Sequence, residues 1–429
     1  MNNPSPSASP SSRTPIPNLR WTICALLFAA TTLNYLDRIV FSVLIPVIRT
    51  EMHISDLQYG YINMAFQVTY TVAFFLAGGF MDRVGTRLGY AVSVLWWSVA
   101  AACHALARTP LTLGFWRGTL GVGESGNFPG AVKAVSEWFP QRERSLAMGY
   151  FNAGATISSI VGPPVIVWIQ RLWGWRACFL ATGALGLVWL ILWLIIYQPP
   201  DAHPSISDAE RAHIQSDASA ENDKAPSAWL AALRHRETWG FALAKFITDP
   251  VWWFYLYWLP PYLYDVRGFN LKEIGWALPF VYVMAGVGSI GGGWLPSYMM
   301  RRGWPLAKAR KSAMLLFAAL MPIASLSALA SRSLFAILLI SLATLAHQGW
   351  SANLFTTTSD VFPKKVVASV TGIGGTLGGL GGIFFSTLIP GIVVTYFGYT
   401  PLILGFGLFH LTGFVIVHRL MGDMKRIAM

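Results

Sequence analysis

The sequence predicts an all-α polytopic membrane protein with about twelve transmembrane helices in two pseudo-symmetric six-helix bundles. Its composition, its apolar segments and an internal repeat predict this fold class. Of the 429 residues, 54% are hydrophobic and only 12% are charged, a balance that is unusual for a soluble globular chain. Many apolar segments reach the roughly 20 residues that a helix needs to cross a bilayer. We predict membrane spans near residues 21–48, 57–80, 88–107, 110–134, 145–170, 175–197, 238–263, 273–299, 310–330, 333–357, 366–396 and 398–420.

The positive charges follow the predicted topology. Lys and Arg residues are far more frequent in the two tails and the even-numbered connections than in the odd-numbered connections. Because cytoplasmic loops carry an excess of Lys and Arg, both termini are predicted to be cytoplasmic. The net charge of +12 therefore reflects topology, and no nucleic-acid partner is expected. An unpaired charge inside a span is costly, and the intramembrane cations that we single out are Arg38, Arg117, Lys133 and Lys245.

Two polar segments divide the chain into domains. Residues 1–20 are rich in Pro and Ser and lack the apolar segment of a signal peptide, so we expect a disordered cytoplasmic tail. Residues 198–236 are predicted to be a cytoplasmic linker. It would join an N-terminal six-helix bundle, residues 21–197, to a C-terminal bundle with a short cytoplasmic tail, residues 237–429.

An internal repeat supports two related halves. Residues 136–142 (SEWFPQR) align without gaps with residues 359–365 (SDVFPKK). Both copies lie where an even-numbered span meets a basic connection, so the two halves have the same orientation. Such a repeat produces a pseudo-twofold axis along the membrane normal, with a substrate site between the halves near the bilayer midplane. The alternative is that each copy merely closes a helix at the interface.

The connection after the second span has the pattern G-x-x-x-D-R-x-G-x-R. It resembles the cytoplasmic loop motif of the major facilitator superfamily, in which an acid and bases join neighbouring helix ends and latch one gating state. Gly85 would permit a tight turn. Alternatively, the arginines serve only the positive-inside rule. The predicted gating residues are Gly78, Asp82, Arg83, Gly85 and Arg87.

The first and fourth spans carry paired charges. Asp37 and Arg38 are adjacent, so on a helix they point about 100° apart and at least one needs a partner elsewhere. Arg117 and Glu124, seven residues apart, share one face of a glycine-rich span. One hypothesis is a pair of buried salt bridges with a purely structural role. The other is that the arginines bind an anionic substrate, because guanidinium groups match carboxylates, while Asp37 or Glu124 binds a proton.

The second half is richer in polar aromatic residues. Trp350, Asn353 and Thr357 recur at helical spacing, and such a face can stack on and hydrogen-bond a sugar ring. Lys245 and Asp249 are four residues apart in the seventh span. They either neutralise each other or leave Lys245 as a further carboxylate anchor.

Two other polar side chains have open roles. Tyr70 in the second span would project its hydroxyl toward the predicted substrate site between the halves. His347 in the tenth span is either a hydrogen-bonded packing residue or a group that titrates near neutral pH.

Four segments together resemble the anion:cation symporter family, and within it the bacterial hexuronate transporters. These segments are residues 34–38, 123–131, 249–260 and 346–355. The resemblance, from about residue 19 to residue 422, implies the major facilitator fold and uptake of galacturonate, glucuronate or a related sugar acid with protons. It implies substrate contacts by Tyr35, Arg38 and Arg117, and proton binding by Asp37 and Glu124.

We therefore predict a symporter in the bacterial inner membrane that imports an anionic sugar acid with protons by alternating access. It is expected to function as a monomer in the lipid bilayer. An antiporter or exporter of organic anions is the alternative, because the same cationic cavity works in either direction. The sequence lacks the H-E-x-x-H, G-x-S-x-G and paired C-x-x-C patterns, so no enzymatic activity, metal or cofactor is expected.

Overall fold

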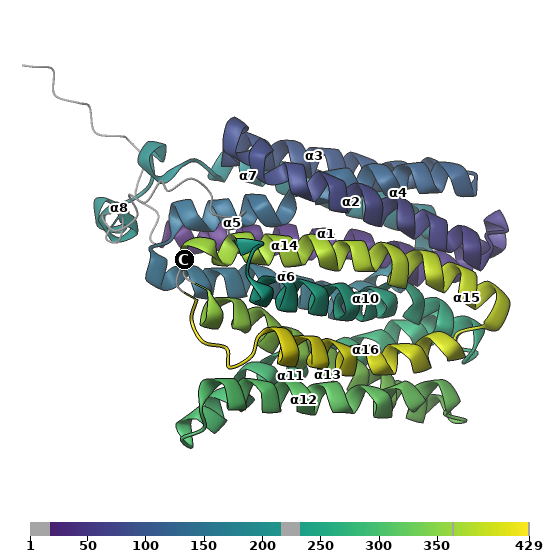
Figure 1. Cartoon of the computed structure of the whole chain (residues 1–429). Helices are drawn as coiled ribbons and strands as arrows, with labels where there is room; N and C mark the ends of the chain where they lie inside the picture. Colours follow the sequence, from purple (N-terminus) through teal and green to yellow (C-terminus); the bar gives the residue numbers. More distant parts are fainter. Residues whose placement is uncertain (1–17, 216–231, 363, 428–429) are drawn as a thin grey trace, which may run out of the picture.

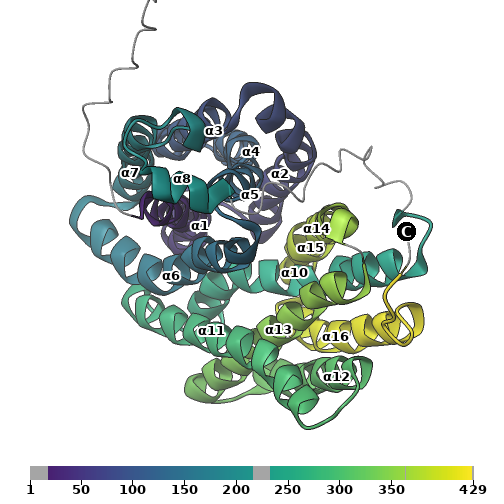
Figure 2. The same cartoon turned by 90° about the vertical axis from the view of Figure 1, so that its left-hand side faces the viewer.

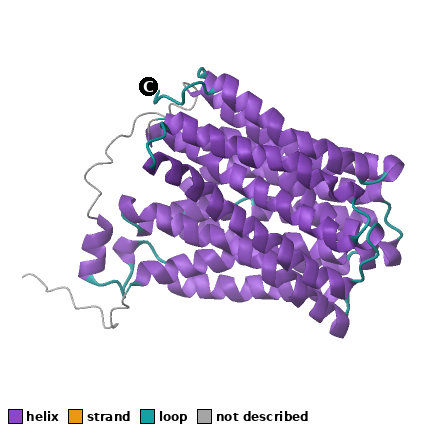
Figure 3. Ribbon diagram, turned by 90° about the horizontal axis from the view of Figure 1, so that it is seen from below, coloured by secondary structure: helices purple, strands orange, loops and turns teal. Residues whose placement is uncertain are grey.

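The computed structural model describes residues 18–215, 232–362 and 364–427, with the side chains at 82, 141, 142, 144–146, 364, 365, 368 and 369 excepted. Within these ranges every regular element is a helix (Figure 3). Most of the predicted N-terminal tail and the middle of the predicted linker lie outside the described residues.

The first bundle consists of six spans, the fourth of which is broken. Its helices are α1 (Leu19–Met52), α2 (Asp56–Val84), α3 (Thr86–Cys103), α4 (Pro110–Glu124), α5 (Asn127–Trp138), α6 (Gln141–Trp173) and α7 (Trp175–Ile196). Helices α4 and α5 follow one another and together form the fourth span. Between the two bundles in the sequence, the linker contains α8 (Asp208–Gln215).

The second bundle has the same number of spans. Its helices are α10 (Arg236–Asp265), α11 (Leu271–Arg301), α12 (Leu306–Ser325), α13 (Ser333–Val361), α14 (Lys364–Gly382), the π-helix η5 (Ile383–Leu388), α15 (Ile389–Phe397) and α16 (Thr400–Leu420). Helix α14 continues through η5 into α15 as one span. Short 3₁₀ helices are η1 (His104–Leu106), η2 (Pro200–Ala202) and η4 (Leu326–Leu329).

Ten segments of the described chain are long and apolar enough to cross a membrane. The other two of the twelve spans are the broken α4–α5 pair and α10, which carries Lys245, Asp249 and three prolines. Local sequence fixes several helix ends: Ser55 and Asn270 begin α2 and α11 with capping boxes. Gly85, between α2 and α3, has a φ of +85°, which favours glycine.

The two bundles lie side by side, with α6 of the first next to α11 of the second (Figures 1 and 2). We name the end that carries α8 the α8 end and the opposite one the far end (Figure 1). Toward the far end, one cluster of buried apolar side chains includes residues of α1, α2, α10 and α16. Toward the α8 end, each bundle has its own apolar cluster. Apolar packing therefore joins the bundles mainly at the far end.

Polar contacts also close the far end. The guanidinium of Arg49 on α1 lies 2.7 Å from the carboxylate of Asp265 on α10. The hydroxyl of Tyr59 on α2 donates a hydrogen bond of 2.5 Å to the backbone carbonyl of Tyr257 on α10. Both contacts join the bundles, so this conformation is closed at the far end.

Helix α8 is tied to the start of the first span. The carboxylate of Glu210 accepts hydrogen bonds from the backbone N–H groups of Leu19 and Arg20 and from the Arg20 side chain. It therefore caps the N-terminus of α1. Burial opposes ionisation of nearby Glu143, but hydrogen bonds with His213 and Arg20 prevail and lower the pKa of that carboxyl. The part of the linker up to Gln215 is thus fixed to the first bundle.

Candidate functional site

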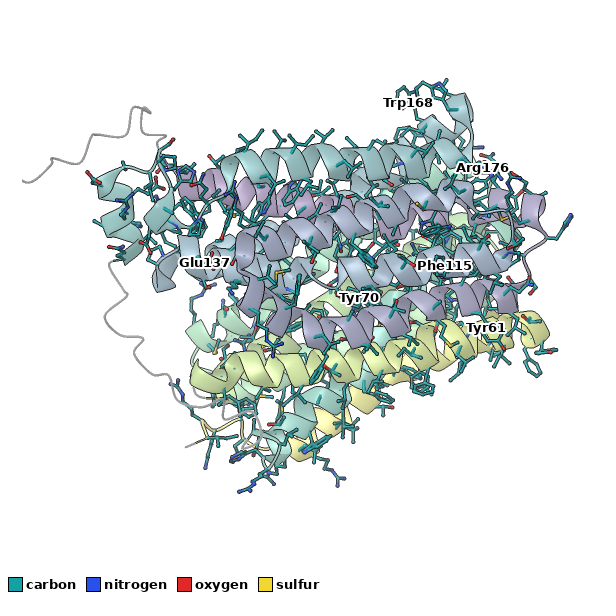
Figure 4. The ribbon with its side chains drawn as sticks, turned by 90° about the horizontal axis from the view of Figure 1, so that it is seen from above. Tyr61, Tyr70, Phe115, Glu137, Trp168 and Arg176 are labelled. Atoms are coloured by element: carbon teal, nitrogen blue, oxygen red, sulfur yellow. The ribbon has the colours of Figure 1, made fainter. Side chains whose placement is uncertain are left out.

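A cavity of about 190 Å³ lies between the two bundles. Figure 4 shows Tyr70, one of its lining residues, at mid-length of the molecule, with Glu137 toward the α8 end and Arg176 at the far end. Helices α1, α2 and α5 of the first bundle and α10 and α14 of the second line the cavity. Its lining includes Tyr35, Arg38, Tyr70, Asp249, Trp253 and Thr376.

Arg38, which lines the cavity, belongs to a buried ion pair. Nε of Arg38 lies 2.5 Å from Oε2 of Glu124, and both side chains are almost completely buried. The Arg38 guanidinium also faces aromatic rings, with its carbon 4.9 Å from the ring centre of Tyr35, 4.6 Å from that of Tyr70 and 5.3 Å from that of Trp253. These distances allow cation–π attraction. Both bundles thus contribute rings around one cation.

The ion pair has unused hydrogen-bonding capacity. Among the described residues, Nη2 of Arg38 and Oε1 of Glu124 have no hydrogen-bond partner. A guanidinium carries five N–H donors in a planar fork that can hold a carboxylate with two parallel bonds. Arg38 therefore keeps an unpartnered donor in a side chain that lines the cavity, as a carboxylate-binding residue requires.

Arg117 does not line this cavity. Its guanidinium donates hydrogen bonds of 3.2 Å to the backbone carbonyls of Asp37 and Arg38 on α1. It also lies between the rings of Phe41 and Phe66, 5.0 and 4.9 Å from their centres. We expected Arg117 to contact substrate. In this conformation it instead supports the α1 backbone that carries Arg38.

Asp37 points away from the cavity. Its side chain is only 3% exposed and lies beside Thr182 of α7. Because Asp37 and Arg38 are adjacent, they point in different directions on α1. The structure therefore brings Arg38 and Glu124 together and leaves Asp37 and Arg117 outside that pair.

Lys245 and Asp249 form a second ion pair beside the cavity. Nζ of Lys245 lies 2.6 Å from Oδ2 of Asp249, and it lies 4.1 Å from the ring centre of Phe355. Asp249 lines the cavity, with Lys245 behind it. The structure thus agrees with the first alternative for these residues, mutual neutralisation.

Three predicted sugar-binding residues on α13 lie within the second bundle. The indole N–H of Trp350 donates to the hydroxyl of Thr248 on α10, and the amide of Asn353 donates to the carbonyl of Gly292 on α11. Thr357 bonds to its own helix and is also fully buried. The helical face that they share is turned toward α10 and α11. None of the three lines the cavity in this conformation.

His347 belongs to a packing cluster. Its Nδ1 lies 3.1 Å from Nε2 of His410, and its ring stacks on Trp252. Both histidines are buried. This arrangement fits the packing alternative.

Several cavity residues were absent from the prediction. Gln67 and Thr71 lie four residues apart on α2, on the same face as Tyr70. Polar residues at that spacing in an apolar span could have revealed them. Asp249, predicted only as a partner of Lys245, and Trp253 lie in one of the segments that resemble the anion:cation symporters. Thr376 lies in a glycine-rich segment that gives no such signal.

The predicted gating motif lies at the α8 end of α2 and α3. Arg87 donates a hydrogen bond of 2.7 Å to the backbone carbonyl of Leu194 on α7, and Arg83 is exposed. The Asp82 side chain lies outside the described residues. The latch function stays a prediction.

The two repeat copies hold equivalent acids. Glu137 in the first bundle accepts hydrogen bonds from the hydroxyls of Thr86 and Tyr197. Asp360 in the second accepts a hydrogen bond of 2.9 Å from Arg310. Each acid joins the end of its span to other helices of the same bundle, so the two repeat copies make similar contacts.

Comparisons with known proteins agree with this architecture. The model of the Major Facilitator Superfamily matches residues 27–386. The hexuronate transporter of Escherichia coli (strain K12) is 35% identical over 406 residues, 94% of each chain. The galacturonate transporter of Dickeya chrysanthemi is 39% identical over 285 residues, 66% of this chain and 82% of that one. A solved bacterial homologue of the human lysosomal transporter Spinster, inward-facing and unoccupied, has a TM-score of 0.76 at 17% identity, over 96% of this chain and 99% of that one.

Proposed function

The chain belongs to the major facilitator superfamily, whose members are membrane transporters, and we propose that it imports a hexuronate such as galacturonate or glucuronate together with protons. This proposal rests on Arg38, which lines an aromatic cavity between the bundles and pairs with the buried Glu124. The named substrates of the two similar transporters supply the substrate class. We place the protein in a bacterial inner membrane with both termini cytoplasmic.

Exchange of partners at Arg38 couples substrate to protons. A substrate carboxylate that binds Arg38 competes with Glu124 for the guanidinium. Glu124 would then be a buried carboxylate without its counter-charge, which is strongly unfavourable. Binding a proton at Glu124 removes that cost, so substrate and proton are bound together. Asp37 is a second proposed proton site.

We propose that the two bundles move against each other to give alternating access. With the α8 end in the cytoplasm, a conformation closed at the far end is the inward-facing one. Opening the far end requires separation of Arg49 from Asp265 and of Tyr59 from Tyr257. We propose that the motif from Gly78 to Arg87 latches the opposite, outward-facing state.

Galacturonate is expected to stabilise the purified protein against thermal unfolding, whereas galactose, which lacks a carboxylate, is not. A ligand at 100 times its Kd stabilises the folded state by about 2.7 kcal/mol. Thermal unfolding in detergent with each sugar checks this expectation. An equal shift with galactose would remove the carboxylate from recognition.

Addition of galacturonate at symmetric pH is expected to drive an inward positive current. A hexuronate is a monoanion near pH 7, so cotransport with two protons moves one positive charge, and with one proton moves none. One charge is worth about 2.3 kcal/mol per 100 mV of membrane potential. Currents on solid-supported membranes measure this. Robust uptake without current would exclude two protons.

A further inference from the structure

Two cation–carboxylate pairs lie beside the cavity, one in each bundle, and one member of each pair lines it. Arg38 and Glu124 pair in the first bundle, and Lys245 and Asp249 pair in the second. Among the described residues that line the cavity, Arg38 is the only cation and Asp249 the only acid. With both pairs intact, the charges around the cavity cancel.

Helix α14 fits closely around the second pair. A Cβ atom at Gly378 would lie 2.4 Å from Oδ2 of Asp249, and one at Gly374 would lie 3.1 Å from Cδ of Lys245. The two glycines are four residues apart, as are the two charged residues that they face. A side chain at position 378 would collide with Asp249, and one at position 374 would collide with Phe241 beside Lys245, so glycines let α14 pack closely over the pair.

The pair is also shielded on its other sides. Lys245 is 5% exposed and lies over the ring of Phe355, while Asp249 is 19% exposed toward the cavity. A substrate therefore meets the carboxylate of Asp249 first, with the ammonium of Lys245 behind it. This pole of the cavity can accept hydroxyl donors but repels a second anionic group.

We propose that Asp249 is a specificity-determining residue that restricts the site to sugar acids with one carboxylate and excludes sugar diacids such as galactarate. This inference rests on the proposed function. The single carboxylate of a hexuronate binds Arg38, and its hydroxyl groups face Asp249. A diacid would bring its second carboxylate against Asp249, because Lys245 is already neutralised. That extra buried charge has no partner, so the diacid is rejected.

Competition against labelled galacturonate uptake by proteoliposomes tests this inference. In the wild type, unlabelled glucuronate should compete and galactarate should not. Asp249→Asn removes the negative charge, and Asp249→Ser also makes room beside Lys245. Both variants are expected to gain inhibition by galactarate, with the inhibitory concentration falling roughly tenfold or more relative to glucuronate. The serine variant should gain more, since a carboxylate can enter the freed space.

Two controls make the result specific. Asp360→Asn removes an acid of the same bundle that contacts Arg310 away from the cavity, and it should leave the galactarate preference unchanged. Lys245→Met combined with Asp249→Leu removes both charges and should gain no galactarate inhibition. Equal inhibition of the wild type by galactarate and glucuronate would overturn the inference, as would folded Asp249 variants with wild-type preference. Absence of galacturonate uptake by the wild type would instead contradict the proposed function.

Discussion

Arg38→Ala is expected to abolish galacturonate uptake. Arg38 is the lining cation of the cavity, and its removal takes away the planar fork that would hold the substrate carboxylate. Hydrogen bonds to charged groups contribute about 1.5–3 kcal/mol each, so affinity should fall roughly tenfold to a hundredfold per bond lost. Uptake into membrane vesicles and binding to the purified variant measure the effect.

Folding must be separated from binding in this experiment. Removal of one partner from a buried ion pair costs about 3–5 kcal/mol, and Glu124 would be left alone. Arg38→Lys keeps the charge, yet an ammonium cannot form the fork, so it should restore folding better than uptake. Arg176→Ala, at an exposed ion pair with Glu51, is the matched control and should transport normally. Near-normal affinity in folded Arg38→Ala would remove Arg38 from the site.

Arg117→Ala is also expected to abolish uptake, because Arg117 positions helix α1. Arg117 holds the α1 carbonyls of Asp37 and Arg38, so its loss should let the Arg38 guanidinium move. Wild-type affinity and uptake in this variant would show that α1 is positioned without Arg117.

Glu124→Gln is expected to retain exchange of galacturonate but to lose uphill accumulation. The amide keeps the shape of the side chain beside Arg38 and cannot take up and release a proton. Counterflow in proteoliposomes reports exchange, and uptake under an imposed pH gradient reports accumulation. Glu51→Gln, an exposed acid at the far end, is the control and should accumulate substrate normally. If Glu124→Gln concentrates galacturonate as the wild type does, the coupling acid is another residue.

The sequence was sufficient to predict the fold, because lipid imposes a strong length and polarity constraint on every span. Apolar segments and the repeat predicted two six-helix bundles, and the comparisons support that architecture. The break between α4 and α5 and the π-helix η5 were not predicted. Both features depend on how neighbouring helices pack, and the length of an apolar segment carries no information about that packing.

The site was predicted less completely. Intramembrane charge correctly singled out Arg38 and Glu124 as residues that need partners, and the structure pairs them. Helical spacing grouped Trp350, Asn353 and Thr357 on one face, but spacing does not say which neighbour that face meets. The same limit applies to Arg117, whose partners are backbone carbonyls that no side-chain pattern reveals.

We propose above all that a proton gradient drives import of a hexuronate through this chain. Purified protein in proteoliposomes with an acidic exterior and an alkaline interior should accumulate labelled galacturonate above its external concentration. A proton carrier that collapses the gradient should abolish accumulation, and excess glucuronate should compete. Uptake that is independent of the pH gradient and requires an organic anion inside the vesicles would contradict proton-driven import and identify an exchanger.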